Sequence, residues 1–153
     1  MADTIFDKIA AGTMDAFVVW QDDNHMAFLT PFPNTPGLTV LIPKKNIGDD
    51  FAELSEEDAA ALQIAAQKVA RILKKAFGVA RVAMVIEGTG VAYVHVKLHP
   101  LHGDLAAETN IHAGQKQIEF VENYRGWLTT IEGPKMDDDK LREIQQKILE
   151  AEK

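Results

Sequence analysis

Apolar and polar positions along the chain predict five β-strands. Four of them are short apolar runs, and the turn-like segment 21–24 joins the first two as a hairpin. A loop holding three prolines follows at 31–37, where proline excludes regular structure. The four runs cover residues 16–20, 26–30, 38–42 and 81–86.

The fifth strand alternates strictly from Tyr93 to Pro100. Period-two alternation sends successive side chains to opposite faces of a sheet. One face of this strand is apolar, and the other carries a row of polar or ionisable groups. The segment Glu87-Gly88-Thr89-Gly90 reads as a tight turn that makes this strand the antiparallel neighbour of 81–86. The polar row consists of Tyr93, His95, Lys97 and His99.

Three segments have helical patterns. The longest is predicted over 55–77, where Ser55 and Asp58 have capping-box spacing and Gly78 is placed to end the helix. A short helix with Asp3 as its N-cap is predicted to end at Gly12, and a last helix to begin at 137 with an acidic first turn. The apolar stripe of the long helix is Leu62, Ala65, Val69, Ile72, Leu73 and Ala76.

Together these elements predict a single α+β domain over residues 1–153 with a mainly antiparallel, five-stranded sheet. One long helix and one or two shorter helices accompany the sheet. Residues 101–114 are predicted to be loop and to include the isolated His112, and 117–131 lacks clean periodicity. For Tyr124 and Trp127, core packing is the favoured role.

Composition narrows the possible functions. The 153 residues carry 16 basic and 23 acidic side chains, a net charge of −7, which argues against non-specific binding of nucleic acid. There is no cysteine, no apolar run of membrane-spanning length and no basic-then-apolar leader at the N-terminus. We therefore expect no membrane association and a cytoplasmic location.

The polar row suggests phosphoryl chemistry. An imidazole such as that of His95 can attack phosphorus or transfer protons near neutral pH. Lys97 lies two residues away on the same face, roughly 6–7 Å along the strand, and its cation can reach a shared phosphate. The plain alternative is a solvated sheet face. A metal site formed by His95, His99 and His102 is a further alternative, although no partnering carboxylate is evident nearby, and we predict no cofactor.

Several segments resemble the histidine-triad (HIT) superfamily of nucleotide hydrolases and transferases in their order and spacing. Residues 3–9, DTIFDKI, resemble the family's opening D-T-I-F-x-K-I. Residues 23–29 and 36–45, DNHMAFL and PGLTVLIPKK, resemble its D-x-x-x-A-F and P-G-H-x-L-V-I-P-K segments. The signature His-φ-His-φ-His-φ-φ, with φ apolar, falls on 93–99. The match covers about 3–102 and leaves 103–153 as a C-terminal extension.

The resemblance assigns roles to the polar row. His95 matches the central histidine, the family's nucleophile, which becomes transiently nucleotidylated. Tyr93 replaces the first histidine and keeps only a hydroxyl, and Lys97 replaces the third, which contacts phosphate in the family. His99 stands at an apolar position of the signature and supplies an imidazole that the triad has lost.

The resemblance also suggests a nucleotide pocket. Ile5, Phe6 and Phe28 match residues that line the base site, although core packing explains the two phenylalanines equally well. Thr30 stands where the family commonly has the aspartate that binds ribose. Gly88 and Gly90 can bring backbone N–H groups to a phosphate, although glycines also suit a tight turn.

The implied function is hydrolysis of a nucleoside phosphoramidate, a nucleotide ester or a dinucleoside polyphosphate through a nucleotidyl-His95 intermediate, by a homodimer. The expected partner is therefore a nucleotide or nucleotide conjugate. Because two triad histidines and the ribose aspartate are replaced, the main alternative is a nucleotide-binding or interaction module of the same fold that has lost catalysis. A metal-dependent hydrolase is the third possibility.

Overall fold

The computed structural model describes residues 3–103 and 135–152. His112, Tyr124 and Trp127, which the sequence analysis considered, lie outside these ranges. The described elements, in chain order, are α1 (Ile5–Ala10), β1 (Phe17–Gln21), β2 (His25–Leu29), β3 (Thr39–Pro43), the 3-10 helix η1 (Phe51–Glu53), α2 (Glu56–Phe77), β4 (Val82–Glu87), β5 (His95–Pro100) and α4 (Asp138–Glu152).

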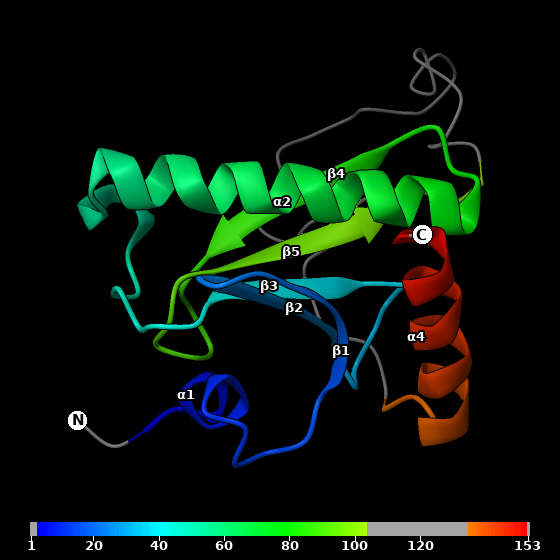
Figure 1. Cartoon of the computed structure of the whole chain (residues 1–153), viewed down its shortest axis with the longest axis horizontal. Helices are drawn as coiled ribbons and strands as arrows, with labels where there is room; N and C mark the ends of the chain where they lie inside the picture. Colours follow the sequence, from blue (N-terminus) through cyan, green and yellow to red (C-terminus); the bar gives the residue numbers. More distant parts are fainter. Residues whose placement is uncertain (1–2, 104–134, 153) are drawn as a thin grey trace, which may run out of the picture.

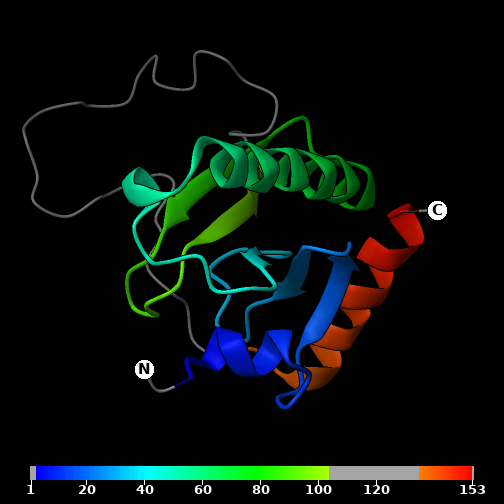
Figure 2. The same ribbon diagram turned by 60° about the vertical axis from the view of Figure 1, so that its left-hand side comes forward.

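The strands form one antiparallel sheet in the order β1-β2-β3-β5-β4. Helix α2 crosses one face of this sheet, α1 lies on the opposite side, and α4 runs beside β1 (Figures 1 and 2). The α+β fold with a five-stranded sheet, one long helix and shorter helices is therefore confirmed. The four apolar runs form β1 to β4, with boundaries displaced by about one residue.

The ends of the long helix are those that the sequence predicts. The Ser55 hydroxyl accepts a hydrogen bond from the Asp58 backbone N–H, and Gly78 ends α2 in the left-handed conformation with φ 63°. The N-cap of α1 differs from the prediction, because Thr4 takes this position instead of Asp3. Thr4 and Asp7 form a capping box in which each side chain binds the other's backbone N–H.

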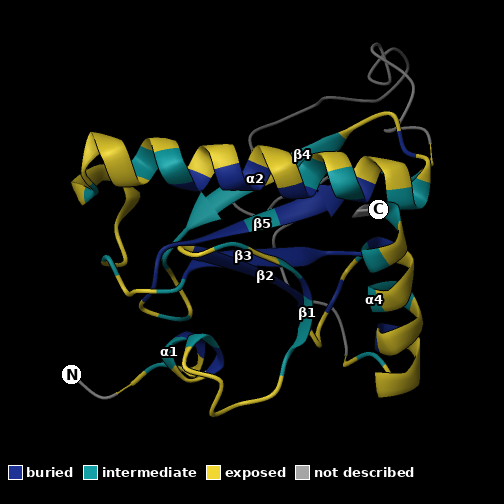
Figure 3. Ribbon diagram, viewed as in Figure 1, coloured by how far each residue is buried: buried dark blue, intermediate teal, exposed yellow. Residues whose placement is uncertain are grey.

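The two faces of the sheet have separate apolar cores, which account for the dark-blue stretches in Figure 3. The larger core lies between the sheet, α2 and α4, and it includes Val94, Val96 and Leu98 from the alternating segment. The smaller core lies on the α1 side and consists of Phe6, Ile9, Met26, Phe28, Val40, Ile42 and Tyr93.

The alternating segment is only partly a strand. β5 begins at His95, so Tyr93 precedes it, and β4 extends through Glu87. The connection therefore spans 88–94, longer than the tight turn predicted at 87–90. The alternation correctly predicts which side chains face the larger core, but it places the start of the strand too early. The Val94 N–H donates at 2.7 Å to the carbonyl of Gly48, which lies in no neighbouring strand, so Val94 is not part of the ladder.

The last predicted helix is α4, which begins one residue after the predicted start. It buries Leu141 and Ile148 in the larger core. Within the described ranges, no helix has both the length and the apolar character needed to cross a bilayer.

Candidate active site

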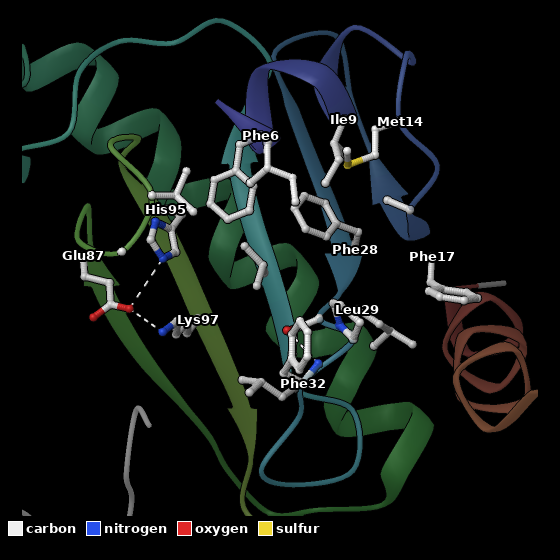
Figure 4. A pocket seen from close by; sticks show the side chains of 18 of the residues that line it. Phe6, Ile9, Met14, Phe17, Phe28, Leu29, Phe32, Glu87, His95 and Lys97 are labelled. Atoms are coloured by element: carbon white, nitrogen blue, oxygen red, sulfur yellow. Dashed lines mark hydrogen bonds and ion pairs between the residues drawn. The ribbon is translucent and has the colours of Figure 1, made fainter. Parts of the chain in front are cut away.

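A cavity of about 640 Å³ lies on the α1 side of the sheet. Its polar end is formed by Glu87, His95 and Lys97, and aromatic and aliphatic side chains form the rest of its wall (Figure 4). An apolar wall beside a few polar groups is the usual construction of a small-molecule site. The aromatic lining residues are Phe6, Phe17, Phe28 and Phe32, and the aliphatic ones include Ile5, Ile9, Leu38, Val40 and Val91.

His95 is held in one tautomer. Its Nδ1 lies 2.8 Å from the backbone carbonyl oxygen of Tyr93, and the side chain is only 3% exposed. A carbonyl oxygen can only accept, so Nδ1 carries the proton and the neutral ring keeps its lone pair on Nε2. The Phe6 ring packs against the imidazole at 5.2 Å between centroids, which fixes its orientation further. His95 therefore lines the cavity with Nε2 as the unprotonated nitrogen of the neutral ring, 3.5 Å from Glu87 Oε1.

Burial is the main influence on the pKa of His95 and lowers it below its ordinary value. The Tyr93 carbonyl and the charge of Glu87 act in the opposite direction, and the charge of Lys97 acts in the same direction as burial. The imidazole is consequently neutral at neutral pH, which is the form that can attack an electrophile.

Glu87 is the functional candidate that the sequence analysis missed. Cross-strand register pairs Glu87 with His95, and its Oε1 lies 3.5 Å from His95 Nε2 while forming an ion pair with Lys97 Nζ (Figure 4). The sequence makes no carboxylate evident near these histidines, and the pairing of β4 with β5 brings one beside His95. Pairing residues 81–87 with residues 95–99 as antiparallel strands would have placed Glu87 opposite His95. That pairing requires the length of the 88–94 connection, which the sequence pattern did not give.

Tyr93 and His99 are buried and are not among the described residues that line the cavity. The Tyr93 hydroxyl donates to the Pro43 carbonyl at 2.6 Å, and burial raises its pKa to about 12. Burial, with the charge of Lys97, lowers the pKa of His99 to about 4. Neither ring nitrogen of His99 has a hydrogen-bond partner in the described structure.

Most of the predicted nucleotide-binding residues meet at the cavity. Ile5, Phe6, Phe28, Thr30 and Gly90 line it. The Phe6 and Phe28 rings meet edge to face at 5.7 Å, so the two side chains both pack together and face the cavity.

Gly88 does not line the cavity. A Cβ at this position would overlap the backbone carbonyl of Asp49, so the close approach of these two backbones explains the glycine. Thr30 lines the cavity but its hydroxyl already accepts a hydrogen bond from Phe32 N–H at 3.2 Å.

The three histidines considered as metal ligands do not come together. His102 Nε2 lies 2.9 Å from the Pro36 carbonyl oxygen, and its ring packs edge to face on Phe77. In residues 3–103 and 135–152, no group of three or more His, Cys, Asp or Glu side chains is arranged to hold a metal ion.

Comparison with known proteins places this site in a family context. Residues 11–104 match the model of the HIT domain. An uncharacterised HIT-like protein of Chlamydia trachomatis is 29% identical over 113 residues, which cover 67% of this chain and 94% of the relative. A HIT family hydrolase from Legionella pneumophila is 28% identical, with a TM-score of 0.56 over 63% of this chain and 91% of that one. A HIT-like protein involved in cell-cycle regulation, from Bartonella henselae, shares the fold with a TM-score of 0.69 at 22% identity, over 97% and 96% of the two chains.

Proposed function

This chain belongs to the HIT domain family, and from that premise we propose that it hydrolyses a phosphoryl bond of a nucleotide conjugate through a nucleotidyl intermediate on His95. The substrate is a nucleoside phosphoramidate, a nucleotide ester or a dinucleoside polyphosphate. The observation that supports this most directly is the tautomer of His95, whose Nε2 lone pair faces a cavity large enough for a nucleoside.

The reaction proceeds in two steps. In the first, the Nε2 lone pair forms a bond to phosphorus, the bond from phosphorus to the leaving group breaks, and the leaving group departs with that electron pair and takes up a proton. In the second, water adds its oxygen to phosphorus and releases its proton, and the phosphorus–nitrogen bond breaks. Nε2 thereby recovers its lone pair, and the nucleotide leaves as a monophosphate.

Neighbouring residues support these steps. The Lys97 ammonium lies at the cavity end beside His95 and holds the phosphoryl oxygens as their negative charge increases. Tyr93 assists indirectly, because its backbone carbonyl accepts the hydrogen bond from His95 Nδ1–H and so fixes the tautomer of the imidazole. His99 has no part in this proposal, because it is buried and does not line the cavity. The phenylalanine-lined wall takes the base, with Thr30 on the ribose side and Gly90 on the phosphate side.

The name of the Legionella relative, a HIT family hydrolase, agrees with hydrolysis. Family members bind nucleotides, and the apolar wall formed by Phe6 and Phe28 suits a base that stacks or inserts against aromatic rings. These points support a nucleotide conjugate as the substrate class.

We expect the substitution His95→Ala to abolish turnover, because it removes the atom that attacks phosphorus. Intact-protein mass spectrometry after mixing with an adenosine phosphoramidate should show the added nucleotidyl mass on the unmodified protein and not on His95→Ala. The control is His102→Ala, since His102 lies away from the cavity and should leave the adduct unchanged. A nucleotidyl adduct that persists in His95→Ala would contradict the mechanism.

A second candidate, a nucleotide-binding module without turnover, is favoured by the position of β5. The strand begins at His95. The segment 95–101, HVKLHPL, fits the signature His-φ-His-φ-His-φ-φ with one histidine replaced, by Lys97. The alignment on 93–99 has two histidines replaced and puts His99 at an apolar position. In that alignment Lys97 occupies the central place, and its ammonium, paired with Glu87, is no nucleophile. Nucleotide binding in calorimetry without adduct or product would select this candidate.

A further inference from the structure

We propose that Glu87 is an internal counter-anion that competes with substrate for Lys97 and thereby makes the site select ligands of low negative charge over polyphosphate chains. This inference rests on the proposed function in taking a nucleotide as the ligand, and among the proposed substrates it favours the phosphoramidate or ester over the dinucleoside polyphosphate. It concerns how the site discriminates between ligands and is independent of whether His95 forms an adduct.

The geometry makes Glu87 a fixed part of the site. It is the last residue of β4, directly opposite His95 on β5, and Val85 is in turn opposite Lys97. Two adjacent antiparallel strands therefore hold the carboxylate beside both functional side chains, as Figure 4 shows. The side chain of Glu87 is 22% exposed and that of Lys97 14%, so solvent screens this pair less than it screens a surface pair.

The same carboxylate changes the charge balance of the cavity. Among the described lining residues, the ionised groups are Asp15, Glu87 and Lys97, since burial keeps His95 neutral. Two anions against one cation leave this lining with an excess of one negative charge. The lone cation is already ion-paired, so the site is not the electropositive cradle expected for a polyphosphate.

Consequently, a phosphoryl group has to reach Lys97 in the presence of Glu87. A nucleotide conjugate with a single charge on the reacting phosphate can share the ammonium with the carboxylate. Each additional phosphate charge adds repulsion from Glu87 in a partly buried site, where charges interact more strongly than in water. Affinity should therefore fall along a series of nucleotides of increasing charge, and Glu87 should account for most of the fall.

The test is calorimetric titration of the full chain with AMP, ADP and ATP, and with their uridine counterparts, in buffer containing EDTA. For the unmodified protein we expect binding to weaken from mono- to triphosphate. In Glu87→Gln the affinity for ATP should rise about tenfold, and that for AMP no more than about threefold, because neutralising one charge matters most to the most charged ligand.

Two variants serve as controls. Glu87→Asp keeps the charge and should keep the order of affinities. Glu53→Gln removes an exposed carboxylate outside the cavity, with the same change in net charge, and should leave the ATP-to-AMP affinity ratio unaltered. Higher salt should narrow the difference between the unmodified protein and Glu87→Gln.

The outcomes separate this inference from the proposed catalysis. An ATP-to-AMP ratio that stays the same in Glu87→Gln overturns the inference, even if His95 forms its adduct. A ratio that rises in Glu87→Gln without any adduct supports the inference and contradicts the proposed hydrolysis. Failure of every nucleotide to bind either protein contradicts the inference together with the ligand class on which it rests.

Discussion

At the scale of single residues, burial decides which polar groups of β5 can act. His95, Lys97 and His99 share one strand face, yet only the first two line the cavity. His99 is 1% exposed, and neither of its nitrogens has a hydrogen-bond partner within the described ranges. Such a ring is stable in the interior only when neutral, because protonation would bury a charge beside the Lys97 ammonium.

This environment predicts that acid destabilises the fold through His99. Its pKa is about 4 in the folded chain and about 6.5 when unfolded. Between these values the unfolded state binds one more proton, so stability rises with pH and is lost as pH falls from about 6.5 to about 4. The full effect is at most roughly 3 kcal/mol.

Urea unfolding at pH 7.5 and pH 5 measures this loss. We expect His99→Leu to retain more of its stability at pH 5 than the unmodified protein, because leucine cannot be protonated. His25→Leu is the control, because His25 is also buried but its ring nitrogen pairs with the Asp22 carboxylate. We expect this variant not to retain more of its stability at pH 5 than the unmodified protein. Equal losses in His99→Leu and the unmodified protein would contradict the role of His99.

At the scale of elements, α4 completes the fold although it lies beyond the residues 11–104 that match the family model. The Gln145 side-chain amide donates to the Val18 carbonyl at 2.8 Å, next to the irregularity in the pairing of β1 with β2. Ahead of the helix, Met136 N–H donates to the carbonyl of Pro31, which lines the cavity. The helix thus supports both the first strand and the cavity rim.

Removing a core contact of α4 should therefore destabilise the whole domain. Ile148 is fully buried, so Ile148→Ala should lower the free energy of unfolding by about 2–5 kcal/mol in chemical denaturation. Gln146→Ala, at an exposed position two residues earlier, should change it by less than about 0.5 kcal/mol. A loss below about 1 kcal/mol for Ile148→Ala would mean that α4 is peripheral.

At the scale of the whole molecule, the two outer strands of the sheet differ. Among the described strands, β1 is the outer strand at one end and has α4 packed along it, whereas β4 is the outer strand at the other end and its Met84 is 44% exposed. An apolar outer strand offers its backbone N–H and C=O groups to another chain. The homodimer implied by the family resemblance remains a prediction, and β4 is the edge through which we expect the partner to pack.

Met84→Lys should shift the protein toward a monomer in size-exclusion chromatography with light scattering, because a charge on an outer strand opposes edge-to-edge pairing. Asn24→Lys adds the same charge in the β1–β2 turn and should leave the association state unchanged. A monomeric unmodified protein, or a Met84→Lys variant that remains dimeric, would contradict this arrangement.

The sequence by itself determined the local structure, because the signals are local. Alternation placed Val94, Val96 and Leu98 on the core face, and Ser55 and Gly78 marked the ends of α2 through hydrogen bonds and backbone geometry within a few residues. The ordered family motifs led to the HIT family, which the match over residues 11–104 shows, and to His95 as nucleophile, which stays a prediction.

Only the tertiary structure decided what surrounds those residues. The Val94 N–H donates to the Gly48 carbonyl and not to a neighbouring strand, so β5 begins only at His95. The connection therefore spans residues 88–94, and Glu87 pairs directly with His95 across the two strands. Burial, which depends on every packed element, separates Tyr93 and His99 from the cavity. Strand register and desolvation both depend on contacts between residues that are distant in sequence. The alternating pattern therefore indicated His95 as a candidate but not the Glu87 carboxylate beside it.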